Sequence, residues 1–145
     1  QSLFEPGQPG LDAQAKATSE AEDHEASNAV DGNPGTMWHT PWGEGAPNFP
    51  HELILTLNAD RAVSGIAVLP RQDGNQNGWI KDYEVYGSLD GRDWGRPLAR
   101  GLFPRNEELK IVTFEGPVTL RHVKLRALSG YARGPYASVA EISVR

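Results

Sequence analysis

Short segments in which apolar and polar residues alternate with a period of two constrain the fold of this chain more than any other feature. Residues 51–57 read HELILTL and place three leucines on one side of an extended chain. Further short segments, apolar or alternating, follow at 62–69, 79–88, 109–114, 118–128 and 137–144. Because successive side chains of a strand point to opposite faces, the pattern is typical of strands that bury one face.

Clusters of Gly, Pro, Asn and Asp separate these segments, and no window holds a helical stripe longer than about two turns. Residues 88–94 (SLDGRDW) contain an Asp-Gly pair that is typical of a hairpin bend. We expect Trp94, directly after this bend, to fold back over the sheet as a lid on the core. Short strands separated by turn residues predict an all-β chain, an antiparallel sandwich or barrel.

Length and charge limit the domain organisation and the partners. The 145 residues suit one domain with a continuous core; we expect a linker or irregular lead-in at 1–10, which is rich in Pro and Gly, and a single domain at 11–145. A net charge of −5 and scattered basic residues argue against a nucleic-acid ligand. The sequence has no apolar run long enough to cross a bilayer and no signal-peptide pattern at Gln1.

The chain contains no cysteine, so it has neither disulfides nor thiolate metal sites. Secreted eukaryotic domains of this size usually carry disulfides, so the composition favours a bacterial extracellular or periplasmic protein, or a cytosolic one. Motifs of catalysis are also missing. The four histidines form no HExxH motif, and no nucleophile elbow, P-loop or dinucleotide fingerprint is present. The acidic run at 20–25 is more simply a solvated face than the acid pair of a glycosidase.

Residues 27–42 (SNAVDGNPGTMWHTPW) form the stretch richest in candidate ligand groups. Asp31, Asn33 and Thr36 place oxygen atoms along a loop bent by Gly and Pro, an arrangement that can wrap Ca²⁺. His39 stands between Trp38 and Trp42, and a hydrogen-bonding ring beside flat apolar faces suits a small polar ligand with one apolar side. The same residue types also make ordinary turns, and we expect one of the two tryptophans in the core.

Two later loops carry further candidates. Residues 70–78 (PRQDGNQNG) combine the rigid donor fork of Arg71 with several amide side chains, which together can recognise paired hydroxyls of a sugar ring. The alternative for this loop is a plain solvated connection. Residues 129–136 (SGYARGPY) hold Tyr131 and Tyr136, and tyrosines in loops often form binding platforms. Tyr136 could instead be the first core residue of the last strand.

The order of these motifs resembles the discoidin superfamily, whose members are also called coagulation factor 5/8 type C domains. The matching segments are AKATSE at 15–20, AVDGNPGTMWHT at 29–40, the Pro70-Arg71 loop, YEVYGSLDGRDW at 83–94 and ASVAEISV at 137–144. The resemblance covers roughly residues 11–145 and is greatest to bacterial family 32 carbohydrate-binding modules. It implies an antiparallel jelly-roll β-sandwich of about eight strands with both termini at one end.

The resemblance implies a structural Ca²⁺ ion that ties an early turn to the last strand. The matching ligands are the carbonyls of Asn28, Asn33, Thr36 and Ala140, the Thr36 hydroxyl, and the carboxylates of Asp31 and Glu141. An all-oxygen shell with two negative charges suits Ca²⁺ and is poor for zinc. Such a site also accounts for a glutamate within an apolar final segment.

The resemblance further implies a sugar site in which the matching residues are His39, Trp42, Arg71, Asn77 and Tyr136. The histidine and the arginine would hydrogen-bond an axial O4, and an aromatic ring would stack on the C–H face of the sugar. This combination selects galactose over glucose, whose O4 points elsewhere. Either Trp42 or Phe49, and either Tyr131 or Tyr136, could be the stacking platform.

The sequence therefore predicts a non-catalytic, calcium-stabilised carbohydrate-binding module for galactose or N-acetylgalactosamine. We expect a monomeric module that is tethered to a secreted bacterial enzyme and targets that enzyme to its glycan. The alternative is a discoidin-type adhesion domain that recognises a protein or a membrane surface. Membrane-binding versions need exposed apolar spikes with basic collars, and this acidic chain shows no clear set. A free-standing enzyme is a third possibility, but the chain has no convincing nucleophile or acid–base pair.

Overall fold

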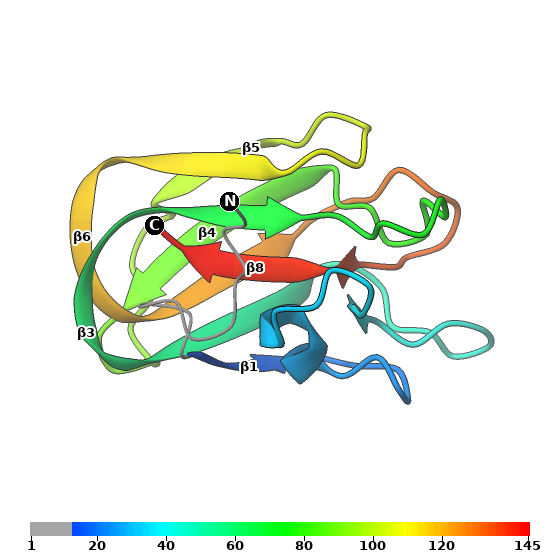
Figure 1. The fold of residues 1–145 in the computed structure, drawn as a ribbon, viewed down its shortest axis with the longest axis horizontal. Coiled ribbons are helices and arrows are strands. Elements are labelled where there is room, and N and C mark those ends of the chain that lie inside the picture. Colours follow the sequence, from blue (N-terminus) through cyan, green and yellow to red (C-terminus); the bar gives the residue numbers. More distant parts are fainter. Residues whose placement is uncertain (1–12) are drawn as a thin grey trace.

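Two long strands, β3 (His51–Leu69) and β6 (Lys110–Ala127), form the framework of the computed structural model, which describes residues 13–145. They pair antiparallel and curve together at one end of the molecule, so that each contributes to both layers of a sandwich (Figure 1). The register shifts between Thr56 and Arg61 and between Val63 and Gly65. Such irregularities increase the local bend and twist of a strand, which is what the change of layer requires.

The remaining strands are added to the edges of this pair. In one layer, β1 (Ala13–Ala17) pairs with the first half of β3, and β4 (Asp82–Ser88) lies between the second half of β6 and β5 (Ala99–Leu102). In the other layer, β8 (Glu141–Val144) pairs with the second half of β3. A separate two-stranded sheet joins β2 (Trp38–His39) to β7 (Ser138–Val139), and a 3-10 helix, η1, spans Ala26–Val30.

The core lies between the two layers, as the alternating pattern predicts. Leu53, Leu55 and Leu57 are buried, while the residues between them are only partly covered. The largest fully buried apolar side chains come from both layers and from the small sheet of β2 and β7: Trp38, Leu53, Leu55, Ile66, Leu120, Leu125, Val63, Val85, Val123 and Val139. Trp38 is therefore the core tryptophan of the 27–42 stretch. The predicted all-β, antiparallel jelly-roll fold of about eight strands is confirmed.

The structure corrects several details of the strand prediction. The segments 51–57 and 62–69 are one continuous strand, as are 109–114 and 118–128, because the polar residues between them stay extended where β3 and β6 curve. The predicted strand at 79–88 begins only at Asp82. The short strands β1, β2 and β5 were not predicted as strands. The proposed lead-in at 1–10 lies outside the described residues.

Trp94 does fold back over a sheet, but the expectation that it covers the core is wrong. Its ring lies over the outer face of β6, where the Lys124 ammonium is 4.2 Å from the ring centroid and the His122 ring is in edge contact. Outward-facing residues of β6 alternate with the buried Val123 and Leu125. Trp94 therefore contacts the Lys124 ammonium and the His122 imidazole on the outer face of the sheet.

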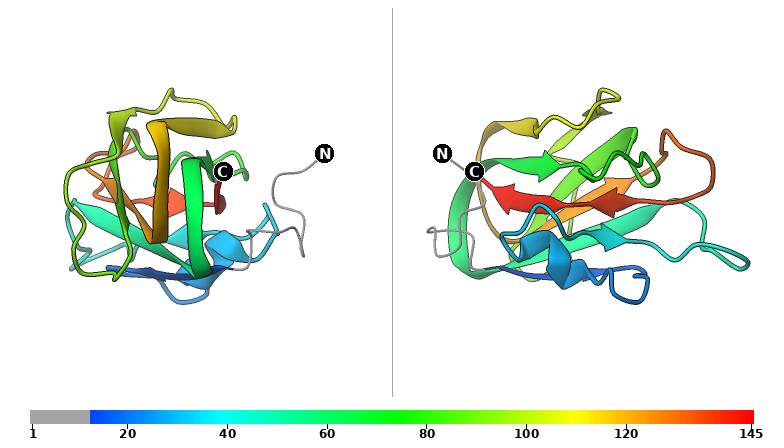
Figure 2. Two further views of the ribbon diagram at one scale, coloured as in Figure 1. Left: turned by 90° about the vertical axis from the view of Figure 1, so that its left-hand side faces the viewer. Right: turned by 45° about the vertical axis from the view of Figure 1, so that its right-hand side comes forward.

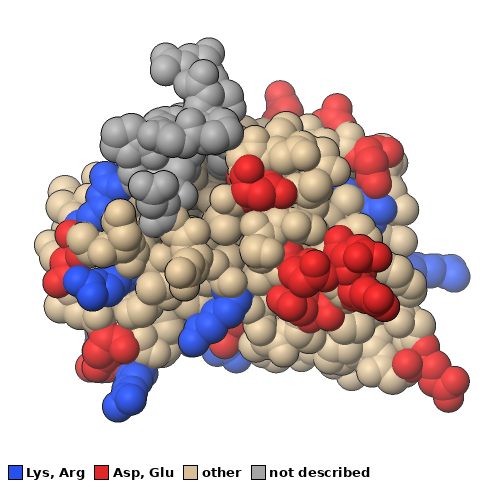
Figure 3. All heavy atoms as spheres, turned by 60° about the horizontal axis from the view of Figure 1, so that its bottom comes forward, with Lys and Arg blue, Asp and Glu red and all other residues tan. Residues whose placement is uncertain are grey.

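The connections gather at one end of the sandwich, which we call the loop end. It is formed by residues 18–25, 40–50, 70–81, 103–109 and 128–137, and it lies opposite the end where the described chain begins and terminates (Figures 1 and 2). On the face shown in Figure 3, acidic side chains gather in one area and basic ones are scattered. Within residues 13–145, no helix has the length and apolar character needed to span a membrane.

Candidate functional site

A pocket of about 240 Å³ opens at the loop end. Its wall is formed by His24, His39, Trp42, Arg71, Asn75, Asn77 and Tyr136. All five residues that the resemblance assigns to a sugar site are among them, although they come from three separate stretches of the chain. The pocket also includes His24 and Asn75, which the sequence analysis did not select.

His39 provides a buried imidazole at the end of β2. Its Nδ1 lies 2.5 Å from the carbonyl oxygen of Thr40, so Nδ1 carries the proton and Nε2 is left as an acceptor. Burial lowers the pKa of His39; the Thr40 carbonyl opposes this effect, and the nearby Arg71 and His24 add to it. The ring is therefore neutral near pH 7 and offers one acceptor nitrogen.

Trp42 supplies the exposed aromatic surface of the site. Its side chain is 55% exposed, and its ring meets the edge of His39 at 5.1 Å and that of His24 at 5.8 Å between centroids. Phe49, the alternative platform, packs against the hydrophobic core and lies 4.9 Å from the His51 ring instead. Of these two residues, Trp42 is the one that lines the pocket.

The two candidate tyrosines also differ in position, because Tyr136 lines the pocket and Tyr131 does not. The Tyr136 ring lies 5.8 Å from that of His39 and forms part of the pocket wall. Tyr131 donates its hydroxyl hydrogen to the carbonyl of Phe103, and the cationic groups of Lys81 and Arg105 each lie 5.7 Å from its ring centroid. Tyr136 is not the first core residue of the last strand, since it is only half-buried and the buried segment begins at Ala137.

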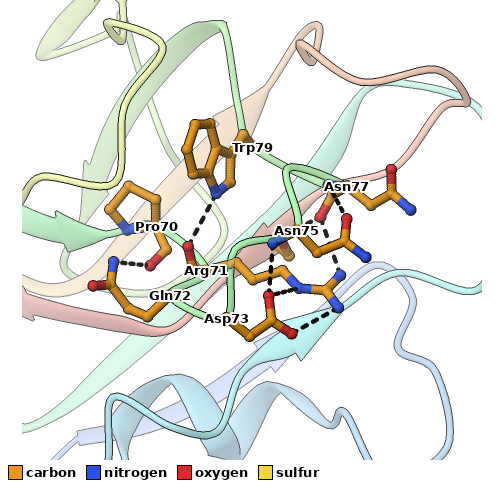
Figure 4. A network of polar contacts seen from close by, with 8 residues as sticks. Pro70, Arg71, Gln72, Asp73, Asn75, Asn77 and Trp79 are labelled. Carbon is orange, nitrogen blue, oxygen red and sulfur yellow. Dashed lines mark hydrogen bonds and ion pairs between the residues drawn. The ribbon is translucent and has the colours of Figure 1, made fainter.

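Arg71 is the centre of a polar network and also lines the pocket (Figure 4). Its Nε and Nη2 donate to the two carboxylate oxygens of Asp73 at 2.8 and 3.0 Å, and its Nη1 lies 3.4 Å from the carbonyl of Asn77. The carbonyl of Arg71 accepts a hydrogen bond from Nε1 of Trp79 at 3.1 Å. The hydrogen bond from Arg71 holds the pKa of Asp73 below its usual value. The network leaves the Arg71 side chain only 15% exposed.

Gly78 ties this loop to β7. It has a φ of +93°, and a Cβ atom placed there would lie 2.3 Å from Oγ of Ser138. The close approach allows the Ser138 amide to donate to the carbonyl of Gly78 at 2.9 Å, and the Ser138 hydroxyl to donate to that of Asn77 at 3.1 Å. Only glycine combines this backbone conformation with this separation. The contact fixes the Arg71 loop beside the segment that carries Tyr136.

The two pocket residues that sequence reasoning missed have different origins. His24 belongs to the acidic run that we interpreted as a solvated face; its carbonyl accepts from the His39 amide at 3.1 Å, and this backbone contact brings its ring to the pocket. Asn75 lies in the same loop as Asn77, whose amide donates to the Asn75 side chain at 2.8 Å. The abundance of amide side chains in 70–78 was the available signal for Asn75.

A second polar cluster lies where the turn after η1 meets β8. Asp31 accepts from the Asn33 amide at 2.9 Å and from the Thr36 hydroxyl. The Thr36 hydroxyl oxygen is also 3.0 Å from the carbonyl of Asn33 and 3.5 Å from that of Asn28. Glu141, which is 2% exposed, accepts from the Asn33 amide at 3.1 Å. Ala140 adjoins the cluster along the chain, and its own amide donates to the carbonyl of Leu69.

The electrostatics of this cluster follow from two neighbouring carboxyl groups, of which Glu141 is buried and Asp31 is exposed. Burial and the neighbouring Asp31 raise the pKa of Glu141 to about 9. Burial acts to raise the pKa of Asp31 too, but hydrogen bonds from Glu141, Thr36 and Asn33 outweigh it and lower the value. Two adjacent carboxylates cannot both ionise without a compensating cation. Within residues 13–145, no group of three or more His, Cys, Asp or Glu side chains is placed so that it could hold a metal ion. The oxygens of the Asp31–Glu141 cluster are carboxylate, hydroxyl and carbonyl oxygens, which are the ligand types that Ca²⁺ prefers.

Comparison with known proteins identifies the family. The model of the F5/8 type C domain family matches residues 14–142, and the chain belongs to this family. Among solved structures, it resembles the family 32 carbohydrate-binding module of Clostridium perfringens NanJ in complex with galactose (TM-score 0.83, 39% identity, 94% of this chain and 95% of that one). It also resembles CpGH89CBM32-5 from the same organism, in complex with GalNAc-β-1,3-galactose (TM-score 0.83, 34% identity, 91% and 94% of the chains).

Curated relatives are much longer proteins. A galactose oxidase of Gibberella zeae is 43% identical over 122 residues, which are 83% of this chain and 18% of the relative. A sialidase of Micromonospora viridifaciens is 40% identical over 124 residues, which are 85% of this chain and 19% of the relative. The chain thus spans less than a fifth of either protein. Since one relative is fungal, the comparisons do not restrict the source to bacteria.

Together, the fold and the comparisons confirm the predicted class. The chain is a carbohydrate-binding module of the family 32 type, because solved modules of this kind match it over nearly their whole length. The domain itself is non-catalytic, as predicted.

Proposed function

We propose that the pocket at the loop end binds a terminal galactose or N-acetylgalactosamine residue of a glycan. The observation that carries this proposal is the convergence of His39, Trp42 and Arg71 in one pocket: an acceptor nitrogen, an exposed aromatic ring and a donor fork. The related modules named above are complexes with galactose and with GalNAc-β-1,3-galactose, which supports the choice of sugar.

The chemistry of the three groups explains the selectivity. The axial O4 of galactose donates to Nε2 of His39 and accepts from Arg71, while the C–H groups of the same ring face stack on the Trp42 indole. Glucose presents O4 equatorially, so a glucose ring stacked on Trp42 leaves the polar partners unsatisfied. An unpaired polar group in a binding site is a strong source of discrimination. Asn75, Asn77 and Tyr136 complete the wall around the sugar.

We infer weak binding by a single site. The pocket has a volume of about 240 Å³ and a monosaccharide makes few contacts, so a Kd of about 1 mM, equivalent to about −4 kcal/mol, is expected. A glycan that offers several copies of the sugar raises the effective affinity through avidity. In this proposal the module is a monomer that is secreted, tethered to a glycan-active enzyme, and holds that enzyme near its substrate.

We also propose that the Asp31–Glu141 cluster binds a structural Ca²⁺ ion, with Asn28, Asn33, Thr36 and Ala140 supplying the neutral oxygens. A divalent cation neutralises the two carboxyl groups when both are ionised. The residues of the cluster connect the turn after η1 to β8, so the ion stabilises this connection. The buried position of Glu141 and the convergence of oxygens around Thr36 support the proposal.

A glycan array tests the proposed ligand class. We expect the domain to bind glycans with terminal galactose or N-acetylgalactosamine, and an Arg71→Ala variant to lose this signal. Binding to none of the glycans, together with binding to anionic vesicles or to a protein surface, would instead favour the adhesion alternative.

A further inference from the structure

The guanidinium of Arg71 is held along one edge. Asp73 binds it side-on through Nε and Nη2, and the carbonyl of Asn77 lies near Nη1. A guanidinium carries five N–H donors, and these contacts engage three of them. Because Asp73 occupies the Nε–Nη2 edge, the edge between Nη1 and Nη2 points away from the carboxylate. The donors that remain without a partner within residues 13–145 do not face Asp73, and Arg71 is one of the residues that line the pocket.

Asp73 itself does not line the pocket. Its Oδ1 accepts one hydrogen bond from Nε of Arg71 at 2.8 Å and another from the backbone amide of Asn75 at 3.1 Å (Figure 4). The carboxylate therefore holds the arginine and a neighbouring segment of the loop together. Trp79 holds the main chain of Arg71 from the other side. The arginine is thus restrained at its backbone and at its head group before any ligand arrives.

We propose that Asp73 is a positioning residue of the sugar site. It holds the Arg71 fork in one orientation, in which the Nη1–Nη2 edge donates to two neighbouring oxygens of the sugar. The proposal rests on the proposed sugar-binding function of the pocket. Its physical basis is preorganisation, because an arginine that is already immobile loses less side-chain entropy when the ligand binds.

The pair formed by Arg121 and Asp60 shows what an ordinary surface ion pair looks like in this protein. Its Nε–Oδ1 distance is also 2.8 Å, and the Asp60 and Asp73 side chains are 54% and 50% exposed. Arg121 is, however, 45% exposed, whereas Arg71 is 15% exposed. Asp60 is therefore a matched control: its replacement removes a similar pair without touching the pocket.

The test compares Asp73→Asn with Asp60→Asn in the intact domain. The asparagine side chain keeps one oxygen that can accept from the Asn75 amide. Its NH₂ group cannot accept a hydrogen bond, so the side chain no longer pairs with both Nε and Nη2 of Arg71. We expect the Kd for galactose to rise roughly threefold to tenfold in Asp73→Asn and to stay unchanged in Asp60→Asn. In ¹⁵N relaxation of the unliganded protein, the order parameter of the Arg71 Nε–H bond should fall only in Asp73→Asn. The melting temperatures of the two variants should be equal.

Each contrary result has a distinct meaning. An unchanged Kd and an unchanged Arg71 order parameter in Asp73→Asn overturn the positioning role. A lower melting temperature together with an unchanged order parameter assigns Asp73 to stability and also overturns it. Both results leave the proposed function intact if Arg71→Ala abolishes galactose binding. Undiminished galactose binding by Arg71→Ala would overturn the proposed function itself.

Discussion

At the scale of single residues, His39 predicts how sugar binding depends on pH. Its pKa lies below the usual value of a histidine because the ring is buried. The neutral ring accepts through Nε2, so binding is complete above the folded-state pKa and is lost as the pH falls through it. Protonation also places a second positive charge beside Arg71. Galactose affinity measured from about pH 8 to about pH 5 should be flat at first and then fall.

The control for this dependence is His39→Gln, whose side chain does not titrate in this range. Some affinity should be lost at neutral pH, but the fall on acidification should be smaller than in the wild type. His24 is the other imidazole that lines the pocket, so His24→Gln is the matched second variant. The role given to His39 would be contradicted if His39→Gln kept the pH dependence of the wild type while His24→Gln removed it.

We expect replacement by alanine to affect sugar binding at Trp42 and stability at Phe49. Trp42 is exposed, so Trp42→Ala should weaken galactose binding by about 1–3 kcal/mol and leave the melting temperature unchanged. Phe49 packs on the core, so Phe49→Ala should lower the free energy of unfolding by at least about 1 kcal/mol. Calorimetric titration and thermal unfolding of both variants check this division. The reverse pattern would make Phe49 the platform.

At the scale of the elements, the loop that carries Arg71 depends on Gly78. Gly78→Ala forces a Cβ atom against Ser138 in a backbone conformation that side chains disfavour, and should destabilise the domain by about 1–3 kcal/mol. Displacement of the loop should weaken galactose binding as well. Gly74 is the matched control: its φ is +84°, but nothing lies within 4 Å of a Cβ there. Equal unfolding free energies for Gly74→Ala and Gly78→Ala would show that the contact with Ser138 is unimportant.

The sequence predicts those elements whose signal is local. The alternation at 51–57 depends on the faces of one strand, and the structure reproduces it. The joining of 51–57 to 62–69 was missed because the polar residues at the curved end look like a turn, but they stay in strand conformation across the register shift between Thr56 and Arg61. The strand β1, only five residues long, gains its identity from pairing with β3, which local sequence does not encode.

The same distinction applies to the site. The family resemblance predicted Arg71, Asn77 and Tyr136. Motifs that follow in the same order along the chain imply that the loops between them occupy the same places in the fold. His24 reaches the pocket through a backbone contact with His39, and no pattern in the acidic run indicates that contact. Asp73 lies in the 70–78 loop, but the sequence analysis did not select it, and the pairing of its carboxylate with Arg71 is visible only in the structure. Such pairings depend on loop conformation, which composition does not determine.

At the scale of the whole molecule, the proposed Ca²⁺ ion predicts a change in global stability. An ion that binds only the folded state stabilises it by RT ln(1 + [L]/Kd), about 2.7 kcal/mol at a hundredfold excess over Kd. A chelator should therefore lower the melting temperature, and Asp31→Ala or Glu141→Ala should abolish this response. Asp60→Ala, at a carboxylate outside the cluster, should retain it. A melting temperature that does not respond to chelation would reject the calcium site.

The central claim is that this domain recognises a galactose-type sugar through its loop end. The most direct measurement is a pair of titrations of the unmodified domain with galactose and with glucose, followed by calorimetry or by NMR shifts. We predict saturable galactose binding that perturbs the signals of Trp42 and the His39 ring, and clearly weaker glucose binding. Superimposable titration curves for the two sugars, or shifts that map away from the loop end, would contradict this claim.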